Sequence, residues 1–115
     1  MDRILLIVLC LLCCSCATWR PSTRYEEMTY QFVNVADGIS TVDRLRYGCS
    51  EKNPLLGQHP SQKDVAVFVV SAGLIHLAVT NYLENNHPEL VPYSQGLSIG
   101  LKTGAVIHNM SLSCN

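Results

Sequence analysis

The feature that most constrains this chain is a long stretch without charge. Residues 65–83 contain no Asp, Glu, Lys or Arg and consist mostly of Val, Leu, Ile and Ala. As an α-helix these nineteen residues would measure about 28 Å, close to the thickness of the hydrocarbon core of a membrane. A helix that is apolar all round must be buried on every side, and a chain of 115 residues offers few neighbours to do so in water. The stretch predicts a membrane-inserted helix. The alternative is the central helix of a soluble oligomer.

A loop bounded by prolines precedes this helix. Residues 51–61 hold two prolines, and each disfavours a helical conformation for the residue before it. One helix must therefore end before the loop and another begin after it. Ser61, with Asp64 three positions later, is typical of a capping box, so we expect the apolar helix to cover residues 62–84.

An amphipathic helix is predicted before the loop. Thr23 and Glu26 have capping-box spacing, and Gly48 suits the left-handed residue that ends many helices, so we expect the helix over residues 24–47. Apolar residues recur at steps of three and four: Met28, Phe32, Val35, Ile39, Val42 and Leu45. The other face is polar: Gln31, Asn34, Ser40, Thr41, Asp43 and Arg44. The helix could lie on a membrane surface, pack on the apolar helix, or cross the membrane with its polar face inward.

A third helix is expected over residues 93–112. Gly96, Gly100 and Gly104 follow one another at steps of four and form a smooth ridge that leads to His108. Small residues at this spacing let helices pack closely in lipid. The alternative is a weakly formed terminal helix, because glycine disfavours helix formation.

One stripe of the apolar helix is not apolar. Gly73, His76 and Thr80 share a helix face. Polar side chains inside a membrane usually face protein rather than lipid. We therefore expect His76 and Thr80, together with His108 of the third helix, to form polar contacts between helices. A catalytic or metal-binding role for His76 is the alternative.

The N-terminus is typical of a lipoprotein signal peptide. An apolar segment, residues 4–12, follows a single cation and is too short to span a bilayer. A small residue then precedes Cys16, which resembles the lipobox of bacterial lipoproteins, whose cysteine receives the lipid and becomes the mature N-terminus. We predict a cleaved signal peptide over residues 1–15 and lipidation at Cys16. The alternatives are lipidation at Cys14, an uncleaved signal anchor, or a cysteine cluster that carries palmitate.

The mature chain is predicted to have a lipid-anchored leash over residues 16–23 and one helical domain over residues 24–115. Besides Cys16 it keeps two cysteines, Cys49 and Cys114. In an exported protein such a pair favours a disulfide. The alternative leaves Cys49 free in the loop and Cys114 free in a frayed tail.

Charge and motifs argue against several classes of function. A net charge of −1 argues against nucleic-acid binding, which needs a basic face. The four histidines lack the short spacings of zinc motifs, and the chain has neither a glycine-rich phosphate loop nor a nucleophile elbow. We expect no enzyme, no catalytic residue, no metal and no cofactor. The sharpest enzymatic alternative would gather four side chains between the helices: Asp37, Glu51, His76 and His108.

The loop and its flanks carry a recognisable pattern: Glu51, Asn53, Pro54, Leu56, Gly57, His59, Pro60 and Ser61, followed by His76, Thr80, Gln95, Ile99 and Asn109. This pattern, over residues 37–110, resembles a group of small, uncharacterised membrane or lipoprotein sequences of bacteria and their phages. The resemblance implies a shared helical, membrane-associated fold. It implies no activity.

These features together predict an all-α lipoprotein, a three-helix membrane-associated bundle on the bacterial cell membrane. We expect a non-catalytic structural or interaction protein of the envelope, encoded by a phage and involved in exclusion or lysis. Its expected partners are membrane lipid and another envelope protein or a second copy of the chain. The alternatives are a pore-like helical oligomer and a histidine-dependent membrane enzyme.

The choice between inner and outer membrane stays open. Four cations lie around the loop, which the positive-inside rule would place in the cytoplasm: Arg44, Arg46, Lys52 and Lys63. Ala17, after the lipidated cysteine, is instead typical of sorting to the outer membrane. With the loop in the cytoplasm, Cys49 and Cys114 would share that side, where a disulfide does not persist.

Overall fold

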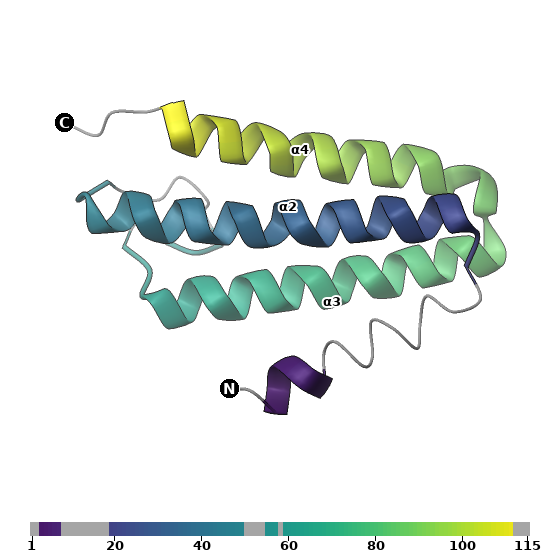
Figure 1. The fold of residues 1–115 in the computed structure, drawn as a ribbon, viewed down its shortest axis with the longest axis horizontal. Helices are drawn as coiled ribbons and strands as arrows, with labels where there is room; N and C mark the ends of the chain where they lie inside the picture. The colour runs from purple at the N-terminus through teal and green to yellow at the C-terminus, as the bar shows by residue number, and fades with distance from the viewer. Residues whose placement is uncertain (1–2, 8–18, 50–54, 58, 112–115) are drawn as a thin grey trace.

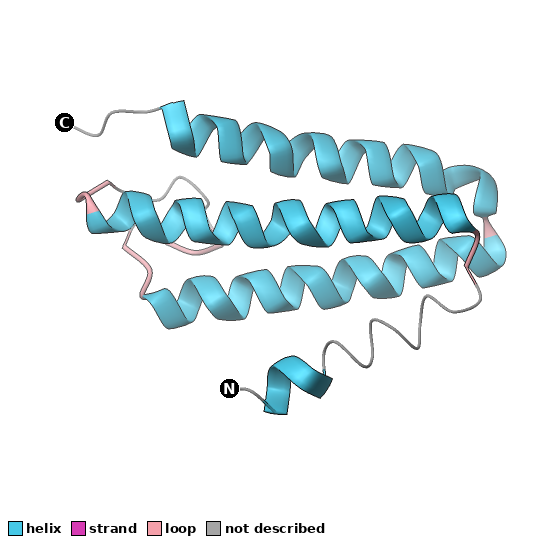
Figure 2. Ribbon diagram, viewed as in Figure 1, coloured by secondary structure: helices cyan, strands magenta, loops and turns pink. Residues whose placement is uncertain are grey.

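Three long helices make up most of the fold. The computed structural model describes residues 3–7, 19–49, 55–57 and 59–111, which are almost entirely helical and contain no strand (Figure 2). A 3-10 turn, η1 (Pro88–Leu90), leads into the last helix, and residues 3–7 form a short helical segment. The long helices are α2 (Pro21–Arg46), α3 (Gln62–Asn86) and α4 (Val91–Ser111). The predicted all-α class is confirmed.

The helix α2 lies between the other two long helices (Figure 1). The loop reverses the chain after α2, so α3 is antiparallel to α2. The turn η1 reverses the chain again, so α4 runs in the same direction as α2. Contacts of α2 with both neighbours are more extensive than those between α3 and α4. Leu55 and Leu56 of the loop line hollows between α3 and α4, so the loop helps to cover that side of the bundle.

The helix ends beside the loop follow the sequence prediction. Gly48 has a φ of +82°, and the amides of Gly48 and Cys49 donate to carbonyls one turn back, 3.1 and 3.2 Å away, in a Schellman arrangement. Ser61 caps α3: its hydroxyl accepts from the Asp64 amide at 3.1 Å, and the Asp64 carboxylate accepts from the Ser61 amide at 2.8 Å. The left-handed glycine and this capping box are confirmed.

The start of α2 differs from the prediction. The helix begins at Pro21, since proline suits a first helical position, and the residue before it provides no side-chain cap. Thr23 therefore lies inside the helix, where its hydroxyl donates to Glu84 of α3 at 3.0 Å. The capping box predicted from Thr23 and Glu26 does not form, and the described part of the predicted leash is bonded to α3.

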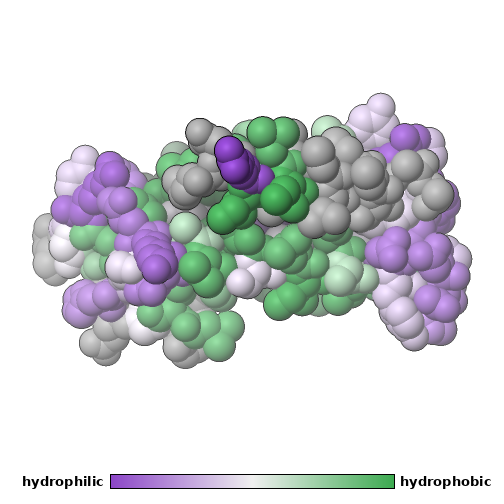
Figure 3. All heavy atoms as spheres, turned by 90° about the horizontal axis from the view of Figure 1, so that it is seen from below, coloured by the Kyte–Doolittle hydropathy of each residue, from purple (hydrophilic) through white to green (hydrophobic). Residues whose placement is uncertain are grey.

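The described part of the bundle buries many polar side chains and exposes many apolar ones, although a few apolar side chains are buried too: Trp19, Tyr30, Val65, Leu77 and Val91. Among the residues that the structure describes, the six largest fully buried side chains include one apolar residue, Val91; the others are Gln95, Glu27, Asn34, Thr23 and Thr80. The apolar residues that recur along α2 point outward, and Phe32 is 77% and Ile39 66% exposed. Figure 3 shows one side of the molecule, with apolar residues over its middle and hydrophilic residues at both ends.

The helix α2 packs on α3, one of the placements predicted for the amphipathic helix, and its polar face is turned inward. Within the described residues one helix, α3, is both long and apolar enough to cross a membrane. The helices α2 and α4 have 26 and 21 residues, which correspond to about 39 and 32 Å of helix.

Candidate functional site

A buried carboxylate connects all three long helices. Glu27 of α2, 1% exposed, accepts hydrogen bonds from four side chains. At Oε1, Gln31 Nε2 lies 2.7 Å away and His76 Nδ1 3.0 Å away. At Oε2, Thr80 Oγ1 and Gln95 Nε2 each lie 2.9 Å away. The donors come from α2, α3 and α4, so this one side chain holds the helices together.

The carboxylate also fixes the orientation of the His76 ring. The two oxygens of Glu27 lie 3.0 and 2.9 Å from Nδ1, and the Tyr30 ring stacks on the imidazole with the ring centroids 3.5 Å apart. Because a carboxylate only accepts, Nδ1 donates, and Nε2 has no hydrogen-bond partner among the described residues. His76 also lines an open hollow of about 560 Å³ between α3 and α4. The pair is half of a general-base arrangement, an imidazole oriented by a carboxylate.

Two glycines let α2 and α3 approach each other closely. A Cβ atom at Gly38 would lie 2.5 Å from Cγ2 of Val69, and one at Gly73 would lie 2.7 Å from Oε1 of Gln31. At this separation Gln31 donates to the Gly73 carbonyl at 3.0 Å, and Asn34 donates to the Val69 carbonyl at 2.9 Å. These bonds continue the polar core along α2 toward the loop.

A second polar cluster joins α2 to α4 near the loop. Oδ1 of Asn109 accepts from Nη1 of Arg44 at 2.8 Å, and Nδ2 of Asn109 donates to Ser40 at 3.0 Å. Lys102 forms an ion pair with Asp37 at 2.9 Å. The inward face of α2 is thus bonded to both α3 and α4 in its first half, around Glu27, and to α4 in its second half.

A charged pair lies at the opposite end of the bundle. The Arg20 guanidinium donates to both oxygens of the Glu84 carboxylate, each at 2.9 Å, and Trp19 Nε1 donates to Asn81 Oδ1 at 3.0 Å. Glu84 follows the uncharged stretch 65–83. The hydrogen bonds from Arg20 lower the pKa of Glu84 from 4.5 to about 2.

We expect Arg20→Gln to lower the free energy of unfolding only modestly at neutral pH, because the Arg20 side chain is 49% exposed and solvent screens the pair. The folded-state pKa of Glu84 lies below its ordinary value of 4.5, so the stabilisation is complete above pH 4.5 and is lost as the pH falls toward 2. Denaturant unfolding in micelles, from neutral pH to about pH 2, should therefore show the wild type and the variant converge. Arg24→Gln, which removes an exposed cation, is the control. If the difference in unfolding free energy between wild type and Arg20→Gln stayed constant over this pH range, it would not come from the pairing of Arg20 with the Glu84 carboxylate.

The structure brings together only some of the predicted site residues. His76 and Thr80 are buried and bonded to α2, as expected of contacts between helices. His108 is exposed on α4 and joins neither polar cluster. Asp37 pairs with Lys102, and Glu51 lies outside the described residues, so the four-residue enzymatic set is not gathered among the members that the structure describes.

The cysteine predictions fall mostly outside the described residues. Cys49 is 5% exposed and disulfide-bonded. Cys16 and Cys114, like the remaining cysteines, lie outside the described ranges. The pairing of Cys49 with Cys114 and the lipidation of Cys16 stay predictions.

The described members of the loop motif shape the connection to α3. Gly57 has a φ of +77°, which favours glycine; His59 is exposed, Pro60 is half-buried and Ser61 caps α3. The other motif residues lie outside the described residues: Glu51, Asn53 and Pro54.

The predicted glycine ridge of α4 points away from the bundle. Gly96, Gly100 and Gly104 are exposed, and a Cβ atom built on any of them would meet nothing within 4 Å in the described part of the chain. The close packing expected at this ridge occurs instead at Gly38 and Gly73.

Glu27 is the functional residue that sequence reasoning missed. It lies on the polar face of α2, four residues before Gln31 and seven before Asn34, so its helical phase was available in the sequence. His76 and Thr80 were the available signal. They lie one turn apart on an otherwise apolar helix and need a polar partner, which Glu27 on the polar face of α2 could provide.

Comparisons with known proteins give no match to a family model, a curated protein or a solved structure. In the ranges that the structure describes, no group of three or more His, Cys, Asp or Glu side chains is placed to hold a metal ion. The functional argument therefore rests on the polar core and on the surfaces around it.

Proposed function

We propose that the protein is a lipid-anchored helical bundle embedded in the bacterial membrane, where it acts non-catalytically as a structural or interaction protein on another envelope component. The observation that carries this proposal is the inverted burial pattern. In water, the arrangement would expose the side chains that the hydrophobic effect normally buries, among them Phe32 and Ile39. In lipid, the same arrangement pairs polar groups inside the protein and leaves apolar side chains for the hydrocarbon.

Helix dimensions support the same placement. Each long helix has enough residues to cross a hydrocarbon core of about 30 Å. The uncharged stretch of α3 ends just before Glu84, which pairs with Arg20. Buried polar contacts between helices, such as those around Glu27, are expected of a bundle in which lipid provides no hydrogen-bond partner.

The outward glycine ridge of α4 supports a role in interaction. A helix that presents Gly96, Gly100 and Gly104 to lipid can receive another membrane helix at short distance. The resemblance of the loop to small bacterial and phage membrane sequences is consistent with an envelope partner, in a process such as exclusion or lysis.

Fractionation of wild type and Cys16→Ser, followed by extraction with alkaline carbonate, tests the proposal. We expect the wild type to carry a lipid-sized increase in mass that the variant lacks, and both proteins to stay in the membrane pellet. Release of Cys16→Ser into the soluble fraction would overturn the embedded bundle and make α3 the core helix of a soluble protein. The absence of added lipid on the wild type would overturn the anchor alone.

A membrane-active oligomer of the same chain is the second candidate, and the outward glycine ridge favours it equally. In that case copies would associate through α4 and make the membrane permeable. Leakage of dye from vesicles that contain the purified protein would favour the oligomer over an interaction with another envelope protein.

A further inference from the structure

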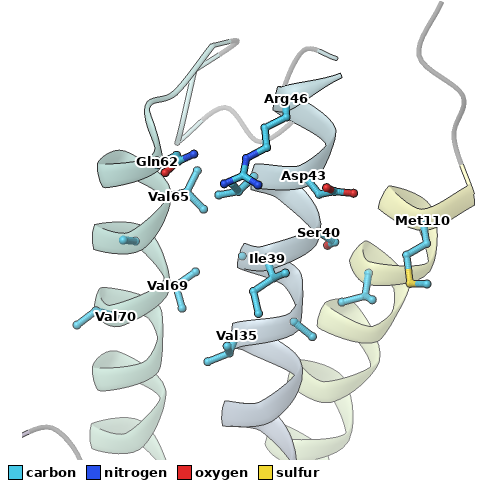
Figure 4. Close-up of a pocket in the computed structure, with 15 residues that line it drawn as sticks. Val35, Ile39, Ser40, Asp43, Arg46, Gln62, Val65, Val69, Val70 and Met110 are labelled. Atoms are coloured by element: carbon cyan, nitrogen blue, oxygen red, sulfur yellow. The ribbon is translucent and has the colours of Figure 1, made fainter. Parts of the chain in front are cut away.

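An open groove of about 740 Å³ runs along α2 and is lined by residues of α3 on one side and by Val106 and Met110 of α4 on the other (Figure 4). Buried Gly38 is among its lining residues, at a point where a Cβ atom would lie 2.5 Å from Cγ2 of Val69. Its walls are mainly apolar: Val35, Ile39, Val65, Val69 and Val70. The groove thus offers an apolar trough along α2, between α3 and α4, in a bundle that we propose to lie in lipid.

One end of this groove has a cationic rim. Arg46, in the last turn of α2, reaches toward α3 beside Gln62 and Val65 (Figure 4). Its side chain is exposed and makes no hydrogen bond or ion pair with any residue that the structure describes. Asp43 also lines the groove, but it points toward α4, whereas Arg46 points toward α3 (Figure 4), so the cationic part of the rim lies on the α3 side.

We propose that the groove binds one acyl chain of an anionic phospholipid and that Arg46 binds the phosphate of this lipid. From Arg46 to Val35 the groove follows α2 for eleven residues, about 17 Å, which accommodates most of an acyl chain. A guanidinium can donate two parallel hydrogen bonds to a phosphate, and Lys63, in the first turn of α3, adds positive charge at the same end of the bundle. Basic residues at one membrane surface attract anionic lipids in the same way.

This inference rests on the proposed membrane placement, so its test compares two lipids. Native mass spectrometry of the full chain, purified in detergent micelles, would follow binding of phosphatidylglycerol and of phosphatidylcholine with identical acyl chains. We expect a preference for phosphatidylglycerol. Arg46→Gln should weaken phosphatidylglycerol binding about fivefold and phosphatidylcholine binding less, because both lipids carry a phosphate but the choline cation neutralises its charge in phosphatidylcholine. Arg24→Gln, an exposed cation near the opposite end of α2, should change neither.

A second pair of variants tests the trough separately from its rim. Ala66 is exposed in the groove, so Ala66→Phe should fill the trough without disturbing the core and should weaken binding of both lipids. Ala78→Phe, at an exposed position of α3 that does not line the groove, should weaken neither. Equal binding of both lipids would overturn the preference for anionic lipid, no effect of Arg46→Gln would overturn the phosphate site, and no effect of Ala66→Phe would overturn the trough. If the membrane placement itself fails, neither lipid binds and carbonate releases Cys16→Ser.

Discussion

Glu27→Ala should lower the free energy of unfolding by about 3–5 kcal/mol, the largest effect expected of any substitution in the polar core. The carboxylate is 1% exposed and accepts from Gln31, His76, Thr80 and Gln95. Without it, donors from three helices are left in a buried site with no acceptor, and each unsatisfied donor carries a desolvation penalty. The effect should be present in micelles and in water, because the site excludes solvent in either case.

Two further variants provide reference values for the loss of stability expected of Glu27→Ala. Thr80→Val removes one of the four donors and keeps the carboxylate, so it should lower the free energy of unfolding by about 1 kcal/mol. Glu26→Ala removes the neighbouring carboxylate, which is only half-buried and accepts no side-chain hydrogen bond within the described ranges, and should have little effect. Denaturant titration of the three variants in the same micelles gives the comparison. A Glu27→Ala protein as stable as Glu26→Ala would show that the helices do not depend on the carboxylate.

Local features of this fold could be predicted because they depend on neighbours in the sequence. Ser61 and Asp64 cap α3 as their spacing indicates, and Gly48 adopts the left-handed conformation that ends α2. The helical phase of His76 and Thr80 also placed them correctly on an inward face. The failed capping box at Thr23 shows the limit of such patterns, because Pro21 had already started the helix and the Thr23 hydroxyl found a partner on another helix.

The direction of burial could not be read from periodicity. Apolar residues at steps of three and four along α2 define a stripe, but the same stripe faces the core of a soluble protein and the lipid around a membrane protein. Which face is inside depends on partners far away in the sequence. Glu27 meets Gln95 of α4, and Arg44 meets Asn109, so the polar side chains select their face through contacts that only the folded chain creates.

Gly38→Leu should lower the free energy of unfolding by about 3 kcal/mol, at the upper end of the usual effect of overpacking. A Cβ atom at Gly38 would already lie 2.5 Å from Cγ2 of Val69, and a valine side chain is too stiff to move aside. The helices α2 and α3 would have to separate, which would also lengthen the hydrogen bond from Asn34 to the Val69 carbonyl. A gain of about 1 kcal/mol in helix propensity offsets only part of this effect.

Gly100→Leu is the matched control, because it makes the same chemical change at a helical glycine where a Cβ atom meets nothing within 4 Å in the described chain. Its unfolding free energy should equal that of the wild type or exceed it by about 1 kcal/mol. Equal losses in the two variants would contradict close packing of α2 on α3. Cross-linking in membranes would measure the association of the same protein with other membrane helices. If Gly100→Leu keeps its stability but loses this association, the outward ridge of α4 is an interaction surface. A glycine-to-leucine change therefore tests packing within the bundle when it is made at Gly38, and contact between molecules when it is made at Gly100.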